Sequence, residues 1–480
     1  MPKETAPAGL ATEIEAIFHP RSIAVVGASA NPDTPGYDYL HALQAFGYAG
    51  EIYPVNPRAE EILGLTSYPS LRATPETVDY VISCIPASAV LDLVDDCAAK
   101  GARALQLFTA RFSETGRAEG TELERRLAER ARAAGVRIIG PNCMGLLYPA
   151  QGISFRADMP QRPGKIGLLS QSGNLLFELT YFGEPRGLRF SKAVSYGNGI
   201  DLNESDFLEY FAADGETAVV GAYVEGVRDG RRFLAALKRA AAAKPAVVLK
   251  GGRTAAGGRA AASHTAALAG QRDVWDAAVA QAGAVPVDTV EELIDMLLAF
   301  AYMRPGGGRR LGMVGGGGGR SVLTADQCEE LGLSVPPLPA DVEKRIAEKA
   351  PDLAGWLTNP VDQSILAGSG VGGTSVLEWM DASPGIDLLL ANVGEAWALG
   401  RPNAEALLNR IPERFAEIGA RTGKPLAAVI GPADYSDERL WRLVSASRET
   451  LVEAELAVFP SVERAVRALA RFVAYWEGRS

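Results

Sequence analysis

The stretch GKIGLLSQSGNLLFEL, residues 164–179, shows a local pattern that recurs along the rest of the chain. A short apolar run (166–169) leads into a Ser-Gln-Ser-Gly turn (170–173), after which apolar residues recur at helical spacing. A run of this kind is typical of a buried strand, and the spacing after the turn is typical of an amphipathic helix. The stretch therefore predicts a strand that turns sharply into a helix, as in parallel β-sheets.

The same strand–turn–helix pattern recurs along all 480 residues. It forms three successive blocks of about five predicted strands each, and Gly/Pro-containing stretches that end near Gly164 and Gly308 separate the blocks. The predicted fold class is α/β, with parallel-sheet domains at residues 1–150, 151–305 and 306–480. One strand expected in the third block is LGLSVPPL, residues 331–338.

Composition excludes several classes of function. Hydrophobic residues make up 47% and charged residues 22% of the chain, and the formal net charge is −10. Binding to nucleic acids or to anionic membranes requires a basic surface, so we expect neither partner. No apolar run is long enough to span a membrane, and the N-terminal residues lack the apolar core of a signal peptide.

The four cysteines form no CxxC pair and no Cys/His cluster. This usage is typical of a protein from a reducing cytosol, and it predicts neither disulfides nor a metal site in this chain. We therefore expect a cytoplasmic protein.

The first block begins with IAVVGASANPDTPGYDYLHAL, residues 23–43, a buried strand, a Gly/Pro loop and a helix. Gly27 and a helix that begins near Gly36 suit a phosphate group held by backbone N–H groups. The loop is not a GxGxxG fingerprint, and the second strand ends in Asn56 and Arg58 rather than in an acidic residue. An NAD site is therefore not expected, and Arg58 would favour a phosphate. A tight turn at Gly27 and a solvated Arg58 are the alternative.

Two further loops of this block follow predicted strands: CIPASAV (84–90), with Pro86, and IIGPNCMGLLYP (138–149), with Asn142. The carboxyl ends of parallel strands line the crevice in which doubly wound sheets bind ligands. Pro, Asn and Gly are also ordinary turn residues, but three such loops at one edge favour a binding site.

In the second block, Ser170, Ser172 and Gly173 lie where the strand of residues 164–170 turns into its helix. Hydroxyls and free N–H groups at a helix start form an anion site, although Ser and Gly are also common helix caps. Further along, the Gly/Ala-rich stretch 250–262 leads to His264, one of three histidines in the chain. Glu225 follows a buried strand and could orient that imidazole. A structural histidine and an exposed glutamate at the end of the strand are the alternatives.

Taken in order, the motifs of this chain resemble those of NDP-forming acyl-CoA synthetases, in particular the α subunits of ADP-forming acetate–CoA ligase and of succinyl-CoA synthetase. The resemblance covers nearly the whole chain and rests on FHPRSIAVVGAS, VNPR, CIPA, GPNCMGL, GKIGLLSQSGN, SYGNGIDLNESDFLEYF, SHTAALAG and TNPVD. It implies a Rossmann-like CoA-binding domain, a flavodoxin-like domain that carries a phosphohistidine, and a second flavodoxin-like ligase domain.

The resemblance also implies roles for individual residues. His264 would carry the phosphoryl group, and Glu225 would steady it. Ser170, Ser172 and Gly173 would bind the phosphate. The residues implied to bind coenzyme A are Gly27, Ser29, Asn56, Arg58, Ile85, Pro86 and Asn142.

The implied reaction interconverts a carboxylic acid, CoA and ATP with acyl-CoA, ADP and phosphate, through an acyl phosphate and phosphohistidine. No ATP-grasp block is evident in the sequence, so ATP and Mg²⁺ are expected to bind mainly to a separate ATP-grasp β subunit in an α2β2 heterotetramer. The chain departs from the family pattern at Arg111, where glycine is common, and at Ala266 and Ala267, where Gly and Ser are common. The acid, the physiological direction and the choice between ATP and GTP stay open.

Three other classes of function make different predictions. A CoA-binding regulatory protein would bind CoA without phosphorylation of His264, and an acyl or carbamoyl transferase on the same scaffold would need no phosphohistidine. An NAD-dependent oxidoreductase would require the dinucleotide fingerprint and the acidic strand end that this chain lacks.

Overall fold

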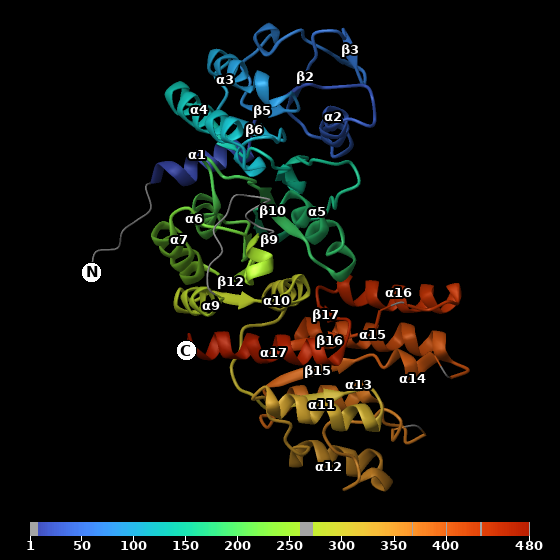
Figure 1. The fold of residues 1–480 in the computed structure, drawn as a ribbon. Helices are drawn as coiled ribbons and strands as arrows, with labels where there is room; N and C mark the ends of the chain where they lie inside the picture. Colours follow the sequence, from blue (N-terminus) through green and yellow to red (C-terminus); the bar gives the residue numbers. More distant parts are fainter. Residues whose placement is uncertain (1–7, 260–271, 367, 400, 433, 480) are drawn as a thin grey trace. The chain divides into compact units, whose positions relative to one another are not determined.

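The computed structural model describes residues 8–259, 272–366, 368–399, 401–432 and 434–479 (Figure 1). The chain divides into two compact units. One comprises Met1–Glu184 and Arg189–Leu293, and the other comprises Pro185–Leu188 and Ile294–Ser480. The predicted α/β class with parallel sheets is confirmed, because two large sheets lie in the first unit and one in the second. The finer division at residues 150 and 305 stays a prediction.

The first sheet has the strand order β2-β1-β5-β6-β7, and all its strands are parallel. The strands are β1 (Ser22–Val26), β2 (Glu51–Val55), β5 (Tyr80–Ser83), β6 (Ala104–Leu107) and β7 (Arg137–Ile139). The helices that connect them are α2 (Pro35–Ala45), α3 (Val90–Ala99) and α4 (Ala118–Ala134), and a short hairpin is formed by β3 (Glu61–Ile62) and β4 (Leu65–Thr66). β1, β5 and β6 are buried throughout, and most of their residues are apolar, as expected for a sheet covered on both faces.

The second sheet repeats this order and adds one strand at its edge: β13-β12-β11-β9-β10-β8. Its strands are β8 (Gly145–Leu147), β9 (Pro163–Ser170), β10 (Phe190–Ser195), β11 (Val219–Val224), β12 (Ala246–Lys250) and β13 (Val285–Val287). Only β8 runs antiparallel. Helices α5 (Gly173–Tyr181), α6 (Glu204–Ala213), α7 (Gly230–Ala243) and α9 (Arg272–Gln281) accompany it. β8 precedes the predicted boundary at residue 150, yet it pairs with this sheet.

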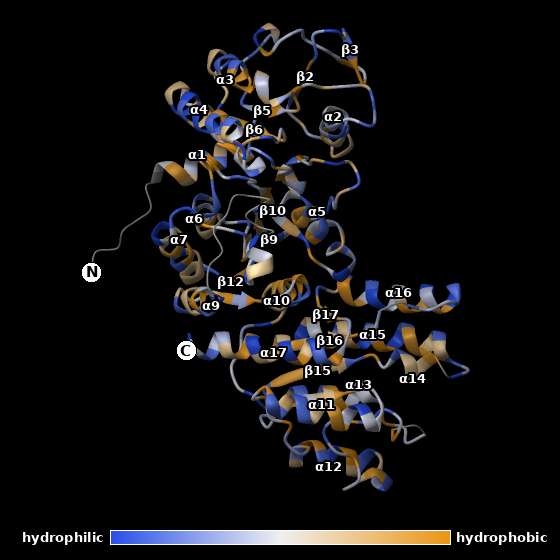
Figure 2. Ribbon diagram, viewed as in Figure 1, coloured by the Kyte–Doolittle hydropathy of each residue, from blue (hydrophilic) through white to orange (hydrophobic). Residues whose placement is uncertain are grey.

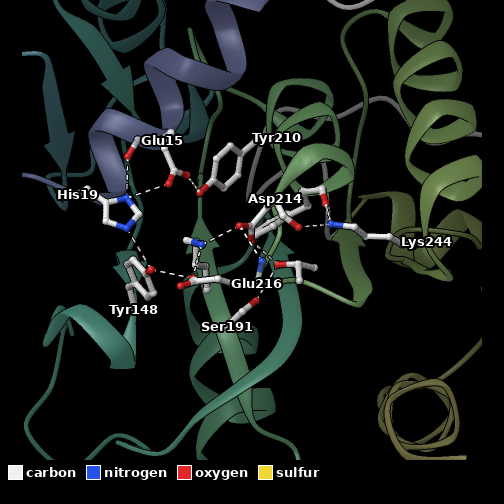
Figure 3. A network of polar contacts seen from close by, with 11 residues as sticks. Glu15, His19, Tyr148, Ser191, Tyr210, Asp214, Glu216 and Lys244 are labelled. Atoms are coloured by element: carbon white, nitrogen blue, oxygen red, sulfur yellow. Dashed lines mark hydrogen bonds and ion pairs between the residues drawn. The ribbon is translucent and has the colours of Figure 1, made fainter.

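The N-terminal helix α1 (Ala8–Phe18) packs against α6 in the same unit. Phe18 stacks on Tyr210 of α6, with ring centroids 5.1 Å apart. Near the amino ends of β10 and β11 lies a partly buried polar network, which we call the amino-end network: Lys192, Asp214, Glu216, Tyr148 and His19. Figure 3 labels all of these residues except Lys192.

Lys192 is the centre of the amino-end network and is only 1% exposed. Its Nζ donates to Asp214 Oδ1 at 2.9 Å and to Glu216 Oε2 at 2.6 Å. Tyr148 O–H donates to the same Glu216 oxygen at 2.7 Å, and His19 Nε2 lies 3.1 Å from the Tyr148 oxygen. The network therefore connects the end of α1 to the strands of the second sheet through paired charges.

The third sheet lies in the second unit, with the parallel order β14-β15-β16-β17. Its strands are β14 (Leu311–Val314), β15 (Leu388–Asn392), β16 (Leu426–Val429) and β17 (Ala457–Phe459). The helices of this unit include α11 (Gly318–Glu330), α12 (Ala340–Lys349), α13 (Gly373–Ala382), α14 (Glu395–Leu399), α15 (Ala404–Arg421), α16 (Glu438–Glu453) and α17 (Val462–Glu477). Helix α10 (Val290–Tyr302) spans the division between the units. β15 is buried throughout and hydrophobic up to its last residue, Asn392, whereas the helices present mixed faces (Figure 2).

The strand predicted over 331–338 is wrong. In this segment the structure has an isolated bridge between Ser334 and Arg310 and no strand. Pro336 and Pro337 lie near the end of this segment, and proline has no N–H group with which to continue a ladder of hydrogen bonds. No helix in the described ranges is both long and apolar enough to cross a membrane.

Candidate functional site

The carboxyl edge of the first sheet opens between β1 and β5. The chain leaves β1 toward β2 on one side, whereas β5, β6 and β7 extend on the other side. A reversal of this kind separates the loops that follow the two central strands and creates the crevice where such sheets bind ligands. Gly27 and Ser29 directly follow β1, and Ile85 and Pro86 follow β5, so the structure brings these predicted residues to the reversal.

The turn after β1 is packed so closely that two of its positions require glycine. Gly27 has φ +89°, and a Cβ atom there would lie 2.9 Å from the carbonyl oxygen of Cys84. A Cβ atom at Gly36, in the first turn of α2, would lie 2.0 Å from the Gly27 oxygen. Helix α2 has no side-chain cap at Thr34, so its amino end suits an anionic group. This backbone-lined turn fits a phosphate-bearing ligand.

Side chains and backbone groups join the neighbouring loops to this turn. Asn56 donates from Nδ2 to the Ala28 oxygen at 2.8 Å, and its Oδ1 accepts the N–H of Arg58 at 2.8 Å. Asn142, with φ +58°, donates its N–H to the Thr109 oxygen at 3.0 Å. The Thr109 hydroxyl in turn donates to the oxygen of Ile85 at 2.6 Å.

The predicted CoA residues thus lie on adjoining loops at one edge. Sequence reasoning missed Thr109, whose only signal is its position two residues after a buried strand.

The second sheet has its own reversal, between β9 and β11. Ser170 ends β9 and is fully buried, and its hydroxyl donates to the oxygen of Ser172 at 2.7 Å. Ser172 is the N-cap of α5, and its Oγ accepts the N–H of Leu175 at 3.3 Å. The sequence folds this way because a serine hydroxyl replaces a missing helical acceptor. The result is a helix start at this edge of the sheet, an arrangement that suits an anion, and the phosphate-binding role of these residues stays a prediction.

Glu225 lies directly after β11 on the same edge and is 6% exposed. Gln171, from the Ser-Gln-Ser-Gly turn, accepts the N–H groups of Glu225 and Gly226 at 2.8 and 3.0 Å. Tyr223 O–H donates to Glu225 Oε1 at 3.2 Å, and burial together with this carboxylate raises the pKa of Tyr223. Lys250 Nζ donates to the Glu225 backbone oxygen at 2.6 Å.

Gln171 was not predicted as a site residue, although it lies inside the quoted turn. Its role depends on a contact across 54 positions of sequence, which no local pattern reveals.

The chain that leaves β12 toward the predicted histidine starts beside Glu225. A Cβ atom at Gly251 would lie 2.5 Å from the Tyr223 hydroxyl oxygen and 3.3 Å from Glu225 Cγ. His264, Ala266 and Ala267 themselves lie outside the described residues.

The two edges adjoin through residues 195–200, which comprise the last residue of β10 and the loop after it. Asn198 N–H donates to the Pro141 oxygen at 3.0 Å, and Met144 N–H donates to Ser195 Oγ at 3.2 Å. A Cβ atom at Gly173 would lie 2.6 Å from Met144 Cγ and 3.5 Å from Ser195 Oγ. The loop after β7, which holds Asn142, therefore packs directly on the start of α5. Among the described residues, no group of three or more His, Cys, Asp or Glu side chains could hold a metal ion.

Comparisons with known proteins agree with this arrangement. Residues 21–149 match the model of a CoA binding domain, and residues 163–300 match that of the succinyl-CoA ligase like flavodoxin domain. The chain is 34% identical over 434 residues to "Acetate--CoA ligase [ADP-forming] II subunit alpha" from Pyrococcus furiosus, covering 90% of this chain and 92% of that protein.

It is 38% identical over 351 residues to "Acetate--CoA ligase [ADP-forming] I" from Archaeoglobus fulgidus, which covers 73% of this chain but only 50% of that longer protein. Among solved structures, the dinucleotide-forming acetyl-coenzyme A synthetase 1 of Ca. Korarchaeum cryptofilum, in complex with phosphate and ADP, is 30% identical. It superposes with a TM-score of 0.82 over 97% of both chains. The chain therefore belongs to the family of ADP-forming acyl-CoA synthetases, with a CoA-binding domain followed by a succinyl-CoA ligase-like flavodoxin domain.

Proposed function

We propose that this chain is the α subunit of an ADP-forming acyl-CoA synthetase that works through phosphohistidine at His264. The observation that carries the proposal is the meeting of two ligand edges within one unit. Residues 195–200 join the loop of Asn142 to the start of α5, and Glu225 lies beside the chain that leads toward His264. A thioester site and a phosphate site on loops that pack against each other suit a reaction that passes through an acyl phosphate.

The proposed reaction has three steps. The His264 imidazole attacks the terminal phosphorus of ATP, and ADP leaves. An oxygen of the substrate carboxylate then attacks the phosphohistidine, which yields an acyl phosphate and free imidazole. The CoA thiolate finally attacks the acyl carbon, and phosphate leaves as the thioester forms. Every step is reversible, and no oxidant or reductant is needed.

The described residues have separate tasks in this scheme. The turn at Gly27 and the loops of Asn56, Ile85 and Asn142 would hold CoA. The amino end of α5, with Ser170, Ser172 and Gly173, would stabilise the phosphoryl group as negative charge moves between oxygens. Glu225 would accept a proton from one nitrogen of the His264 ring, so that the other nitrogen is free to attack phosphorus.

We propose that ATP and Mg²⁺ bind mainly on a separate ATP-grasp β subunit, in an α2β2 assembly. The coverage of 92% of a relative named as subunit alpha supports a partner chain. The coverage of only half of the A. fulgidus ligase is consistent with a further functional part that other family members carry in the same chain.

Incubation of the chain and its partner with Mg²⁺ and γ-³²P-ATP tests the proposal. The wild type should gain an acid-labile, base-stable label that maps to His264, and His264→Asn should gain none while retaining CoA binding. A complex that makes acyl-CoA without any labelled histidine would contradict the relay. A chain that binds CoA but neither takes up label nor supports acyl-CoA synthesis would instead be a CoA-binding regulatory protein. A panel of acetate, branched-chain, aryl and dicarboxylic acids then identifies the substrate.

A further inference from the structure

The turn after β6 contains a backbone conformation that needs an explanation. Arg111 has φ +83°, a left-handed value that favours glycine and strains any other residue. Strain of this kind persists only where surrounding contacts enforce it, and it is concentrated at functional sites. Here the enforcing group is Glu114, whose Oε1 accepts the N–H of Arg111 at 2.5 Å and that of Phe112 at 3.0 Å.

Glu114 is itself held from the second sheet. Asn198, in the loop of residues 195–200, donates from Nδ2 to Glu114 Oε2 at 2.8 Å and to Glu124 Oε2 at 2.8 Å. Asn198 is 5% exposed, so these hydrogen bonds are shielded from water. We call Asn198, Glu114 and Glu124 the Asn198 clamp.

The clamp depends on a neutral donor with two protons. Glu124 is 6% exposed and also accepts from Ser113 Oγ at 2.6 Å and from Arg228 at 3.1 Å. An amide NH₂ group can serve two carboxylates at once, whereas a third carboxylate at this position would repel both. The Asn198 Oδ1 atom is buried and has no hydrogen-bond partner in the structure. The Asn198 side chain thus makes two hydrogen bonds through its NH₂ group while its oxygen is unsatisfied, as expected when the NH₂ group has a specific task.

The clamp lies at the junction of the two ligand edges. Two residues before Arg111, Thr109 is bonded to both Ile85 and Asn142. On the other side, Ser195 contacts Met144 beside the start of α5, three residues before Asn198. The Arg111 side chain is exposed and makes no hydrogen bond or ion pair with any residue that the structure describes.

We propose that Asn198 is a positioning residue that fixes the Arg111 turn through Glu114, and that Arg111 thereby binds the anionic end of the acid substrate. The inference rests on the proposed function, since it assigns a role within that reaction. A guanidinium suits a carboxylate or an acyl phosphate because it offers several donors in one plane. CoA, by contrast, is placed at the loops after β1, β2, β5 and β7.

Steady-state kinetics of the complex, with the acid from the panel that reacts fastest, provide the test. Arg111→Gly relieves the backbone strain and removes the guanidinium, so it should fold with an unchanged or higher melting temperature. We expect the KM for the acid to rise about tenfold, because one charge-assisted contact is lost. The KM for CoA and kcat should stay within about twofold of the wild-type values. Arg111→Lys keeps the charge but not the planar set of donors, so it should recover only part of the loss, and Arg117→Ala is the control for an exposed arginine in the same segment.

Glu114→Gln tests the hydrogen bond between residue 114 and Asn198 and keeps a side chain of the same size at this position. The Gln oxygen can still accept the Arg111 and Phe112 N–H groups, but its NH₂ group faces the NH₂ group of Asn198. The link to Asn198 therefore breaks, together with the 3.1 Å hydrogen bond from Phe112 N–H to Oε2. We expect the same rise in the KM for the acid, and no further rise in Arg111→Gly/Glu114→Gln, since both changes act through one contact.

Additive effects, or a higher KM for CoA instead of for the acid, would overturn the inference, as would an unchanged KM for the acid in Arg111→Gly. A wild-type complex that makes no acyl-CoA from any acid would refute the proposed function instead.

Discussion

Strand β10 has a polar network at each end, and a different group links the carboxylates in each: a lysine at the amino end and an amide at the carboxyl end. At its amino end, Lys192 neutralises Asp214 and Glu216 in a network that holds helix α1. Beyond its carboxyl end, Asn198 joins two carboxylates with a neutral amide, leaves its own oxygen unsatisfied and holds a strained Arg111. The first network has paired charges and no strained residue among its members, so we assign it to stability. The second retains strain and an open acceptor beside the ligand edges, so we assign it to function.

The largest effect should follow from breaking the amino-end network. Lys192→Met keeps the length of the side chain but leaves Asp214 and Glu216 without their cation. Removal of one partner of a buried ion pair typically costs about 3–5 kcal/mol. We expect a loss of this size in the free energy of unfolding measured with urea, whereas the exposed Lys238→Met should be nearly neutral. A Lys192→Met protein of unchanged stability would contradict the assignment of this network to stability.

The carboxyl end also contains a carboxyl group whose charge is poorly compensated. Glu204 begins α6 and is 5% exposed, and burial raises its pKa from the ordinary 4.5 to about 7. A raised carboxyl pKa stabilises the fold fully below pH 4.5, and that contribution disappears as the pH rises through 7. Between pH 4.5 and pH 7 the free energy of unfolding of the wild type should fall by about 3 kcal/mol. Glu204→Gln should remove this slope, and urea unfolding at pH 5 and pH 8 measures it. A slope that persists in the variant would show that another group titrates.

Loss of charge at Glu225 should slow the phosphorylation of His264 and leave the free energy of unfolding unchanged. Glu225→Gln preserves the size of the side chain, but its neutral amide is a weaker proton acceptor for the His264 ring. We expect phosphorylation of His264 to slow about 10- to 100-fold, equivalent to ~1.4–2.7 kcal/mol in the barrier. Rapid-quench labelling with γ-³²P-ATP gives the rate. Equal rates in wild type and variant would remove Glu225 from the mechanism.

A smaller effect concerns how the stability contributed by the amino-end network changes at low pH. Burial alone would raise the pKa of Asp214, but hydrogen bonds from Thr217 and Lys192 outweigh it and hold the pKa below the ordinary 3.8. A lowered carboxyl pKa contributes stability above pH 3.8 that is lost as the pH falls through the folded value. We expect the wild type to lose about 1 kcal/mol more than Lys192→Met between pH 5 and pH 3. Parallel losses in the two proteins would contradict the pairing.

Much of the fold was predictable because each β/α unit is encoded locally. The apolar run of β9, the serine cap of α5 and the glycine turn after β1 all lie within a few residues of sequence. The order of the strands depends on contacts between residues that are far apart in the sequence. This order creates the reversals between β1 and β5 and between β9 and β11. The strand predicted at 331–338 shows where a local pattern is not sufficient. Its residues have the apolar pattern of a strand, but Pro336 and Pro337 lack the N–H groups that a strand needs.

The candidate site was predictable where residues directly follow strands, as with Gly27, Ile85 and Glu225. It was not predictable where a side chain acts across the fold. Gln171 reaches the backbone at Glu225, Thr109 joins Ile85 to Asn142, and Asn198 reaches Glu114 over 84 positions. The positive φ of Arg111 accounts for the glycine expected at that position from the resemblance, because glycine adopts this conformation without strain.

The central claim is that this chain alone contains both the thioester edge and the phosphoryl edge. Incubation of the purified chain, without ATP or a partner, with acetyl-CoA and ³²P-phosphate tests it most directly. Phosphate should displace CoA to give acetyl phosphate, which then phosphorylates His264 and releases acetate. We predict a base-stable label on the wild type and none on His264→Asn. An unlabelled wild-type chain, under conditions where the complete complex converts acetyl-CoA to ATP, would show that the two edges do not form one relay.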